Sequence, residues 1–278
     1  MNIKRILVIG GDSRTKYLGK ALSEEGFGVT FFDESIPLKS AVEEADAVIL
    51  PLPCSRDDKT VDAPNLSEGV LLKDLFHLVG KNKLLLAGKM SEGVKAVADV
   101  FNVKWVDYFQ REELEILNSV PTLEGAIQIM MEELPKTVFG SNVVVTGFGK
   151  VSEPLCIALK NLGANVTVCA RRASQRAKAR IMGMQSVDFS YLSECICDAD
   201  VLFNSVPCKV IRREELLGAK DCLIIDLASK PGGVDMEAAK DLGVRVIWAL
   251  GLPGKVAPIT AGNIIKETIC NIFGELGE

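Results

Sequence analysis

Ten short apolar segments, alternating with helical or loop-like stretches, constrain the fold of this chain more than any other feature. The first five are Arg5–Gly10, Val29–Phe32, Ala47–Leu52, Lys83–Ala87 and Val103–Val106, and the second five are Asn142–Thr146, Asn165–Ala170, Ala199–Asn204, Cys222–Leu227 and Val244–Leu250. Strands buried on both faces of a parallel sheet read as continuous apolar runs, and their alternation with helices is typical of βαβ units. The sequence therefore predicts an α/β fold with two doubly wound parallel sheets.

The length of 278 residues agrees with two such domains. We expect a linking helix that opens at Pro121 and Thr122 and is limited by Pro135. Such a helix forms a hinge and puts a cleft between the two halves. The expected parts are an N-terminal flavodoxin-like substrate domain (1–120), the linking helix (121–140), a Rossmann dinucleotide-binding domain (141–260) and a C-terminal helix that packs across the domain junction (261–278).

The composition is that of a folded and slightly acidic protein. The chain is 48% hydrophobic, which excludes disorder as its main state, and its net charge of −5 argues against nucleic acid or an anionic membrane as the main partner. The longest apolar runs are far shorter than the roughly 20 residues that a membrane-spanning helix needs. The N-terminus leads straight into a strand and lacks a cleavable signal pattern, so we expect a cytoplasmic protein.

The eight cysteines and the single histidine follow no catalytic or metal-binding pattern. No two cysteines form a C-x-x-C pair, so we expect reduced thiols and no metal site, with Cys156, Cys169 and Cys222 as small core residues. His77 lies on the polar side of a helical segment and is interpreted as a solvated surface residue. The second half contains no histidine, which argues against the histidine base of 2-hydroxy-acid dehydrogenases.

The most informative motif begins at Gly147. It follows an apolar strand, opens a helix, and matches G-x-G-x-x-[G/A] except that Ser152 holds the third small position. In this pattern the first glycine makes a tight turn, the second lets the backbone approach a pyrophosphate, and the N–H groups of the helix bind the phosphates. We therefore predict a dinucleotide site that includes Gly147, Phe148, Gly149, Lys150 and Val151.

The end of the next predicted strand indicates which dinucleotide binds. NAD-specific folds place an acid there for the ribose 2′-OH, but no acid occurs from Pro154 to Val187, and Arg171 and Arg172 follow the strand directly. A guanidinium can hold a 2′-phosphate through paired hydrogen bonds. The two arginines therefore favour NADP over NAD.

Turns that follow other predicted strands complete the expected site, because the carboxyl ends of parallel strands line the ligand crevice. In the second half, these turns bring Asn204, Ser205, Val206, Pro207, Ala228 and Ser229 to the cofactor, with Lys230 and Lys255 nearby. In the first half, the turn from Gly10 to Arg14 lacks a phosphate-binding pattern, so we expect no second nucleotide there. Asp12 can cap the following helix, and Arg14 and Lys16 face a position for an anionic substrate.

Together these motifs resemble the A-subunit family of dipicolinate synthases. The resemblance covers essentially the whole chain and rests on segments 10–14, 118–125, 147–152, 204–207, 226–235 and 251–262. The last two segments are long and uncommon, so chance similarity is a poor explanation. Ser152 and Arg172 depart from the family pattern.

The resemblance implies a reaction and a partner. A dihydro- or 4-hydroxytetrahydro-dipicolinate from the lysine pathway would be oxidised to dipicolinate, pyridine-2,6-dicarboxylate, with NADP taking the hydride. It also implies the flavoprotein-like B-subunit of dipicolinate synthase as partner and a cytoplasmic location in the mother cell of sporulating bacteria. Beyond that, we expect a homo-oligomer.

Candidate residues for that chemistry follow from the charges of a dicarboxylate and from the need for one proton acceptor. The candidate substrate contacts are Arg14, Lys16, Thr122 and Lys255, and the candidate catalytic residues are Glu124, Lys230 and Asp12. Two alternatives stay open at this point. The chain could be an NADP-binding regulatory or scaffold subunit whose partner carries the chemistry, or a related dehydrogenase with another small carboxylate substrate.

Overall fold

The computed structural model describes residues 3–277 and divides into two compact α/β units. One unit comprises residues 1–118 and 257–278, and the other comprises residues 119–256. The chain enters the second unit at 118/119, where we placed the boundary at 120/121, and it leaves at 256/257, where we placed the boundary at 260/261. The first unit is therefore assembled from both ends of the chain.

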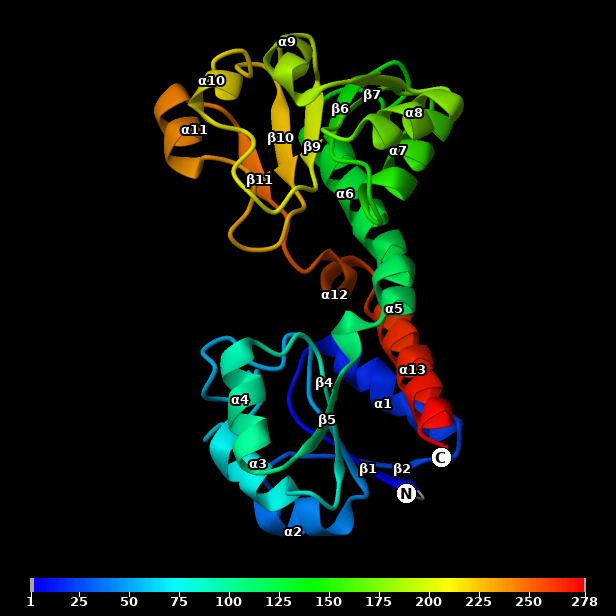
Figure 1. The fold of residues 1–278 in the computed structure, drawn as a ribbon, viewed down its shortest axis with the longest axis vertical. Helices are drawn as coiled ribbons and strands as arrows, with labels where there is room; N and C mark the ends of the chain where they lie inside the picture. The colour runs from blue at the N-terminus through cyan, green and yellow to red at the C-terminus, as the bar shows by residue number, and fades with distance from the viewer. Residues whose placement is uncertain (1–2, 278) are drawn as a thin grey trace. The chain divides into compact units, whose positions relative to one another are not determined.

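Five parallel strands form the sheet of the first unit in the order β2-β1-β3-β4-β5, the doubly wound order of flavodoxin-like folds (Figure 1). These strands are β1 (Arg5–Val8), β2 (Gly28–Phe31), β3 (Ala47–Ile49), β4 (Leu84–Ala87) and β5 (Lys104–Asp107). One face is covered by α2 (Leu38–Glu44), α3 (Leu72–Val79) and α4 (Glu92–Val100). The other face is covered by α1 (Ser13–Glu24), α5 (Glu112–Leu117) and α13 (Pro258–Glu275), and a short 3-10 turn, η1 (Tyr108–Gln110), follows β5.

Apolar side chains on both faces of the strands hold this unit together. In β1, Ile6 and Val8 join the cluster formed with α1, α5 and α13, whereas Leu7 joins the cluster formed with α2, α3 and α4. Successive side chains of a strand point to opposite faces of the sheet. A strand covered by helices on both faces must therefore be apolar throughout, which is why the apolar runs located these strands.

Helix α13 packs against α1 inside the first unit, and a glycine sets how closely the two helices approach. A Cβ atom at Gly262 would lie 2.7 Å from the backbone oxygen of Arg14 and 2.9 Å from the backbone nitrogen of Leu18. We placed the start of this helix at residue 261, but it begins at Pro258. Its predicted apolar residues Ile264, Ile265, Ile269, Ile272 and Phe273 are all buried.

Six parallel strands form the sheet of the second unit in the order β11-β10-β9-β6-β7-β8, the order of a Rossmann fold. These strands are β6 (Asn142–Thr146), β7 (Asn165–Cys169), β8 (Gln185–Val187), β9 (Val201–Asn204), β10 (Leu223–Asp226) and β11 (Val246–Trp248). One face is covered by α6 (Ser119–Glu133), α7 (Ser152–Asn161) and α8 (Ala173–Ile181). The other face is covered by α9 (Leu192–Cys197), which follows the 3-10 turn η2 (Phe189–Tyr191), α10 (Arg213–Leu216) and α11 (Met236–Leu242), and α12 (Leu252–Val256) packs on α6.

Each predicted strand corresponds to a strand of the structure, but the edge strand β8 was missed. Its three residues, Gln185–Val187, are exposed or half-buried and carry two polar side chains, so they do not form an apolar run. Helix α6 begins at Ser119 and places Thr122 in its first turn, and it ends at Glu133 before Pro135.

The surface and thiol predictions can be compared directly with the fold. His77 is exposed and contacts the edge of the Phe101 ring, as we predicted for a surface residue. Cys156, Cys169 and Cys222 are buried, which confirms them as core residues. Within residues 3–277, no group of three or more His, Cys, Asp or Glu side chains is placed to hold a metal ion, and no helix is long and apolar enough to cross a membrane.

Candidate functional site

The turn between β6 and α7 has the backbone shape that the glycine motif predicts. Gly147 has a φ of +83°, a conformation that residues with a Cβ rarely adopt. A Cβ at Gly147 would also lie 2.9 Å from Oγ of Ser205. At Gly149, by contrast, a Cβ would meet nothing within 4 Å. The turn is therefore tight on one side, at Gly147, and open on the other, at Gly149, where a phosphate needs room.

Ser152, the departure from the glycine pattern, has a local structural role. Its side chain is buried, and its Oγ accepts a hydrogen bond of 2.9 Å from the backbone N–H of Gly149. This bond closes the turn at the point where α7 begins. Compared with a glycine, a serine at this position brings helix and strand together less closely, but it adds a hydrogen bond that fixes the loop.

The other residues of this turn, Phe148, Lys150 and Val151, differ in how they could contact a ligand. The Phe148 side chain is buried in the core, and its backbone oxygen accepts a 2.8 Å hydrogen bond from Nε2 of Gln175. Lys150 is exposed, and Val151 is the N-terminal cap residue of α7. Phe148 can therefore contact a cofactor through its backbone alone.

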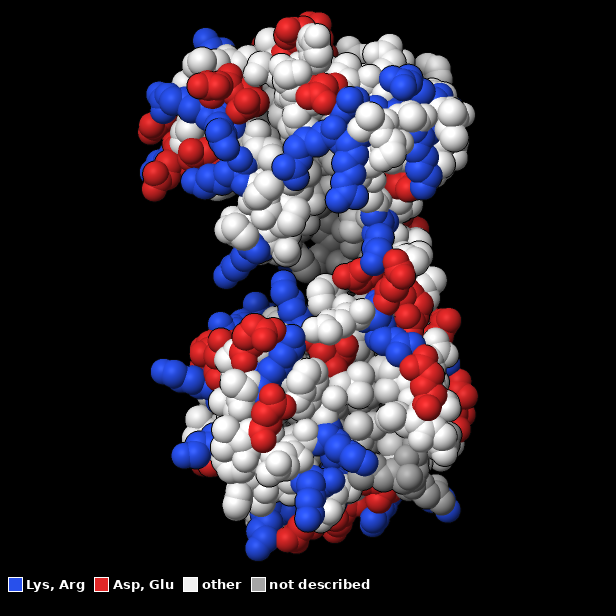
Figure 2. Space-filling view, viewed as in Figure 1, with Lys and Arg blue, Asp and Glu red and all other residues white. Residues whose placement is uncertain are grey.

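Basic side chains gather around the start of α8, and Figure 2 shows Lys and Arg atoms over the part of the second unit where α7 and α8 lie. Arg176 is tied to the carboxylate of Asp188 at 2.6 Å, and Lys178 is paired with Glu153 at 2.6 Å. Arg171 and Arg172 are exposed at the carboxyl end of β7, and no carboxylate of residues 3–277 pairs with either of them. The pairing thus leaves two of the predicted arginines available to an anion.

The last residues of three neighbouring strands form a buried hydrogen-bonded row, which we call the strand-end relay: Thr146, Asn204 and Asp226. The sheet register places Thr146 beside Asn204 and Asn204 beside Asp226. Oγ1 of Thr146 donates to Oδ1 of Asn204 at 2.6 Å, and Nδ2 of Asn204 donates to Oδ1 of Asp226 at 2.7 Å. Each of the three side chains is at most 1% exposed.

Two turns that we predicted to face the cofactor lie directly beyond this relay. Asn204 itself is buried, so in its turn only Ser205, Val206 and Pro207 are half-buried or exposed. Oγ of Ser205 donates to the backbone oxygen of Thr146 at 2.9 Å, which closes this turn against the Gly147 turn. In the turn after β10, Ala228 is buried, whereas Ser229 and Lys230 are exposed.

The first unit has its own polar cluster at the carboxyl ends of its strands. Asp12 caps α1 by accepting from the backbone N–H of Arg14, and its carboxylate also pairs with the Arg14 guanidinium at 2.8 Å. Partial burial raises the pKa of Asp12, but the hydrogen bonds and charge of Arg14 outweigh it, and the pKa is lowered overall. Arg14 also donates to the backbone oxygen of Leu52 at 2.6 Å, and Lys16 is exposed.

The Gly10–Gly11 turn of this unit serves the fold. Both residues have positive φ, and a Cβ at Gly10 would lie 2.7 Å from Cβ of Ala63. The backbone N–H of Gly11 donates to the oxygen of Asp62 at 2.8 Å. The loop at Asp62 and Ala63 thus fills the space in which a phosphate would need to approach this turn.

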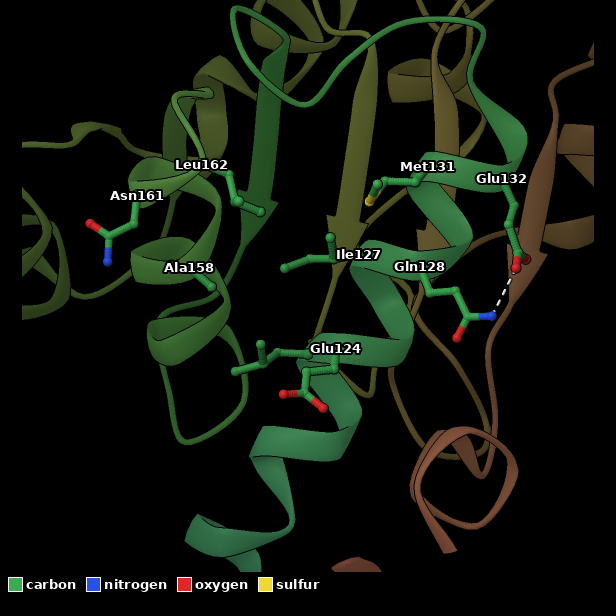
Figure 3. Close-up of a pocket in the computed structure, with 9 residues that line it drawn as sticks. Glu124, Ile127, Gln128, Met131, Glu132, Ala158, Asn161 and Leu162 are labelled. Atoms are coloured by element: carbon green, nitrogen blue, oxygen red, sulfur yellow. Dashed lines mark hydrogen bonds between the residues drawn. The ribbon is translucent and has the colours of Figure 1, made fainter.

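Glu124 belongs to α6 and is not part of the turns that follow β6, β9 and β10. It is exposed on α6 and lines a groove of about 700 Å³ between α6 and α7, together with apolar side chains such as Ile127, Met131 and Leu162 (Figure 3). Gln128 and Glu132 on the same helix are joined by a hydrogen bond of 2.8 Å. No residue of those three turns lines this groove. The other candidates placed outside the turns are Lys255, exposed on α12, and Thr122, half-buried on α6.

Comparison with known proteins gives a consistent picture of ancestry. Residues 5–109 match the family described as the N-terminal domain of the dipicolinate synthase A-subunit. The dipicolinate synthase A-subunit of Bacillus subtilis is 30% identical over 286 residues, covering 98% of this chain and 96% of that protein. The chain belongs to the family of dipicolinate synthase A-subunits.

Solved structures agree with that family membership. The crystal structure of the dipicolinate synthase A-subunit from Bacillus halodurans has a TM-score of 0.88 and 28% identity, and the match covers 97% of each chain. D-lactate dehydrogenase from Escherichia coli has a TM-score of 0.65 at 18% identity, covering 99% of this chain and 97% of the other, so it shares the fold alone. The two parallel α/β units thus have the fold that is also found in this dehydrogenase structure, and the family name implies a second subunit.

The strand-end relay is the part of the site that sequence reasoning missed. Thr146 was interpreted only as the end of an apolar run, and Asp226 as the first residue of a turn facing the site, without a contact between the two. The available signal was that three of the predicted strands carry a polar residue, Thr146, Asn204 or Asp226, at or next to their last position. Parallel strands of similar length bring such ends side by side, so this pattern could have predicted a polar row.

Proposed function

We propose that this chain is an NADP-dependent oxidoreductase that forms dipicolinate from a cyclic dihydro-dipicolinate. The observation that carries the proposal is near full-length similarity to a protein named as the A-subunit of dipicolinate synthase, in a chain whose second unit has an open glycine turn at the start of a helix. In this reaction one hydride leaves the ring, one proton passes to a base, and the ring becomes aromatic. A 4-hydroxytetrahydro substrate is at the same oxidation level as the dihydro compound and would first lose water to form it.

The turn from Gly147 to Val151 would hold the pyrophosphate. The open space at Gly149 allows close approach, and α7 begins directly after this turn, so the positive end of its helix dipole would lie beside a bound phosphate. The nicotinamide ring, when bound, supplies the acceptor for the hydride. Ser205, Val206, Pro207, Ala228 and Ser229 would then bound the pocket on the side of the neighbouring strands.

Arg171 and Arg172 would select NADP by binding the 2′-phosphate. Both are exposed at the carboxyl end of β7, where a carboxylate would be needed to favour NAD. The nearby carboxylates of Glu153 and Asp188 are already paired with Lys178 and Arg176 and offer no acid for a ribose hydroxyl. NAD is the less favoured cofactor in this proposal.

The candidate substrate groups differ in what the structure leaves them able to do. The lowered pKa of Asp12 and its pairing with Arg14 make Asp12 a poor proton acceptor at neutral pH, so we assign it to holding Arg14 in place. Glu124 faces the groove between α6 and α7. Lys230, exposed in the turn after β10, is the candidate we favour for contact with a substrate carboxylate, with Arg14, Lys16, Thr122 and Lys255 as further contacts.

The proposal includes a second protein, because the chain's relatives are named as one subunit of a synthase. We propose that this partner is the flavoprotein-like B-subunit and that the complex acts in the cytoplasm of sporulating bacteria. The alternative, a regulatory NADP-binding subunit, is favoured by the placement of Glu124 and the pairing of Asp12, which leave Lys230 as the main exposed candidate in the turns.

Cofactor titration tests the proposal most directly. We expect the purified chain to bind NADPH more tightly than NADH, and Arg171→Asp to weaken NADPH binding by about 10- to 100-fold, since a charged hydrogen bond contributes about 1.5–3 kcal/mol. Arg180→Asp, at an exposed position on α8, the helix that follows Arg171 and Arg172, is the matched control and should change little. Tighter binding of NADH than NADPH would overturn the role of the two arginines.

The synthase activity needs its own measurement. The chain alone, and the chain with its partner subunit, are given the dihydro compound and NADP, and formation of the pyridine product is followed. Product that requires NADP and is lost in Lys230→Ala supports the oxidoreductase. If product formation is abolished by mutations in the partner's pocket but is unchanged in Lys230→Ala, this chain is the regulatory subunit instead.

A further inference from the structure

The strand-end relay makes side-chain hydrogen bonds that the pairing of three strands does not need. These bonds connect the two turns that bound the proposed cofactor pocket. Asp226 accepts three hydrogen bonds and donates none. Its Oδ1 accepts from Nδ2 of Asn204 and, at 3.0 Å, from the backbone N–H of Ala228. Its Oδ2 accepts from the backbone N–H of Gly233 at 2.8 Å. One carboxylate thereby holds both ends of the turn that carries Ser229 and Lys230.

Asn204 holds the neighbouring turn in the same way. Its Oδ1 accepts from the backbone N–H of Val206 at 3.1 Å, and its Nδ2 donates to the backbone oxygen of Val206 at 3.1 Å. Thr146 fixes which end of the amide faces β6, because its hydroxyl donates to Oδ1 of Asn204. Each group in the row thus determines the orientation of the next.

The backbone beyond the relay is shaped to fit over it. A Cβ at Gly233 would lie 2.0 Å from Nδ2 of Asn204, so a larger residue would displace the amide. Gly232 has a φ of +86°, and Nε1 of Trp248 donates to the backbone oxygen of Ala228 at 2.9 Å. The turn from Ala228 to Gly233 is therefore held by hydrogen bonds to the Asp226 carboxylate of the relay and to the Trp248 indole.

We propose that Asn204 and Asp226 are positioning residues for the oxidation, which act by holding the Ser205–Pro207 and Ala228–Lys230 turns at the nicotinamide end of the pocket. This inference rests on the proposed function. The relay does not reach Gly149 or Arg171, which would bind the pyrophosphate and the 2′-phosphate. Loss of the relay should therefore lower kcat far more than it weakens NADP binding, because orientation of the reacting groups is what it controls.

Asp226→Asn is the sharpest perturbation, because all three partners of the carboxylate are donors. An amide of the same shape must turn its own N–H groups toward at least one of them. Trp248 reports the result: there are two tryptophans, so in a Trp105→Phe background the emission comes from Trp248 alone. Asp235→Asn, which leaves a good helix cap in place at the start of α11, is the matched control.

We expect Asp226→Asn to shift Trp248 emission to longer wavelength and to lower kcat by on the order of 10- to 100-fold, with the dissociation constant for NADP changed less than about threefold. Asp235→Asn should match the parent in all three. Unchanged emission, or a shifted emission with unchanged kcat, would overturn the proposal. A fall in NADP affinity as large as the fall in kcat would overturn it as well.

Asn204→Asp gives an independent test within one folded protein. It places a second carboxylate beside Asp226, and two such groups at this distance share a proton, which raises one pKa. The variant should keep parent-like Trp248 emission at about pH 5 and lose it as the pH rises to about 8, whereas the parent stays constant. A pH-independent signal in this variant contradicts the relay. Absence of turnover in the parent under every condition would count against the proposed function, while the Trp248 measurements still decide the arrangement of the relay.

Discussion

The two glycines of the β6–α7 turn should separate stability from cofactor binding when each is changed to alanine. At Gly147, an alanine must adopt a left-handed backbone, which costs about 1–2 kcal/mol. Its Cβ, 2.9 Å from Oγ of Ser205, would also displace that hydroxyl from its bond to Thr146, which contributes about 1 kcal/mol. The expected loss for Gly147→Ala is therefore about 2–3 kcal/mol.

Gly149→Ala should behave in the opposite way. Its φ is outside the left-handed region and its Cβ would meet nothing within 4 Å, so the folded protein is not strained. Removing a glycine restricts the unfolded chain and should stabilise the protein by up to about 1 kcal/mol. The same methyl group would stand where the pyrophosphate approaches, so NADPH affinity should fall at least about tenfold.

The assay combines urea unfolding, followed by Trp248 emission in a Trp105→Phe background, with NADPH titration. With an m-value of about 2 kcal/mol/M, Gly147→Ala should lower the unfolding midpoint by about 1–1.5 M. Gly149→Ala should leave it unchanged or slightly higher. Parent-like NADPH binding by Gly149→Ala would refute the placement of the phosphate, and parent-like stability of Gly147→Ala would refute the strain argument.

Three further predictions concern packing, acid stability and thiol reactivity. Gly262→Ala should destabilise the first unit by about 1–3 kcal/mol in thermal or urea unfolding, because its Cβ meets α1 backbone atoms, whereas Gly274→Ala on the same helix, with nothing within 4 Å, should not. Burial raises the pKa of Asp46, but the backbone N–H groups of Lys4 and Arg5 outweigh burial and lower this pKa below 3.8. The ionised carboxylate therefore stabilises the fold above pH 3.8, and this contribution is lost as the pH falls through the pKa of the folded state. An Asp46→Asn variant should accordingly lose less stability than the parent in an acid titration. Burial raises the pKa of Cys222 to about 12, so a thiol reagent at neutral pH should modify the exposed Cys197 and Cys208 in the native protein and reach Cys222 only on unfolding, as peptide mass mapping would show.

Most of the fold could be predicted because it depends on local apolar pattern. Strands such as β4, buried on both faces, must be apolar throughout, so they stand out in the sequence. The edge strand β8 escapes this rule because only one neighbour, β7, pairs with it and its side chains are partly exposed. Its existence depends on pairing, which no run of three residues can indicate.

The site was predictable as far as backbone motifs define it. The Gly147 turn followed from spacing, and its geometry in the structure has the tight and open positions that the motif requires. The role of Gly10 did not follow, since it depends on a contact with Ala63, more than fifty residues away in the chain. The orientation of the Asn204 side chain depends on two other strands, so the sequence placed the residue without showing which way it points.

The return of the chain to its first unit has a consequence for synthesis on the ribosome. Residues 119–256 form a complete compact unit, whereas the first unit lacks α13 until residues 258–275 have also been made. Ile264, Ile265 and Ile269 of α13 cover one face of the first sheet together with α1 and α5, and their share of that face stays exposed to water until they arrive. Although domains usually fold from the N-terminus onward as the chain emerges, here the second unit can be completed first and the first unit closes last.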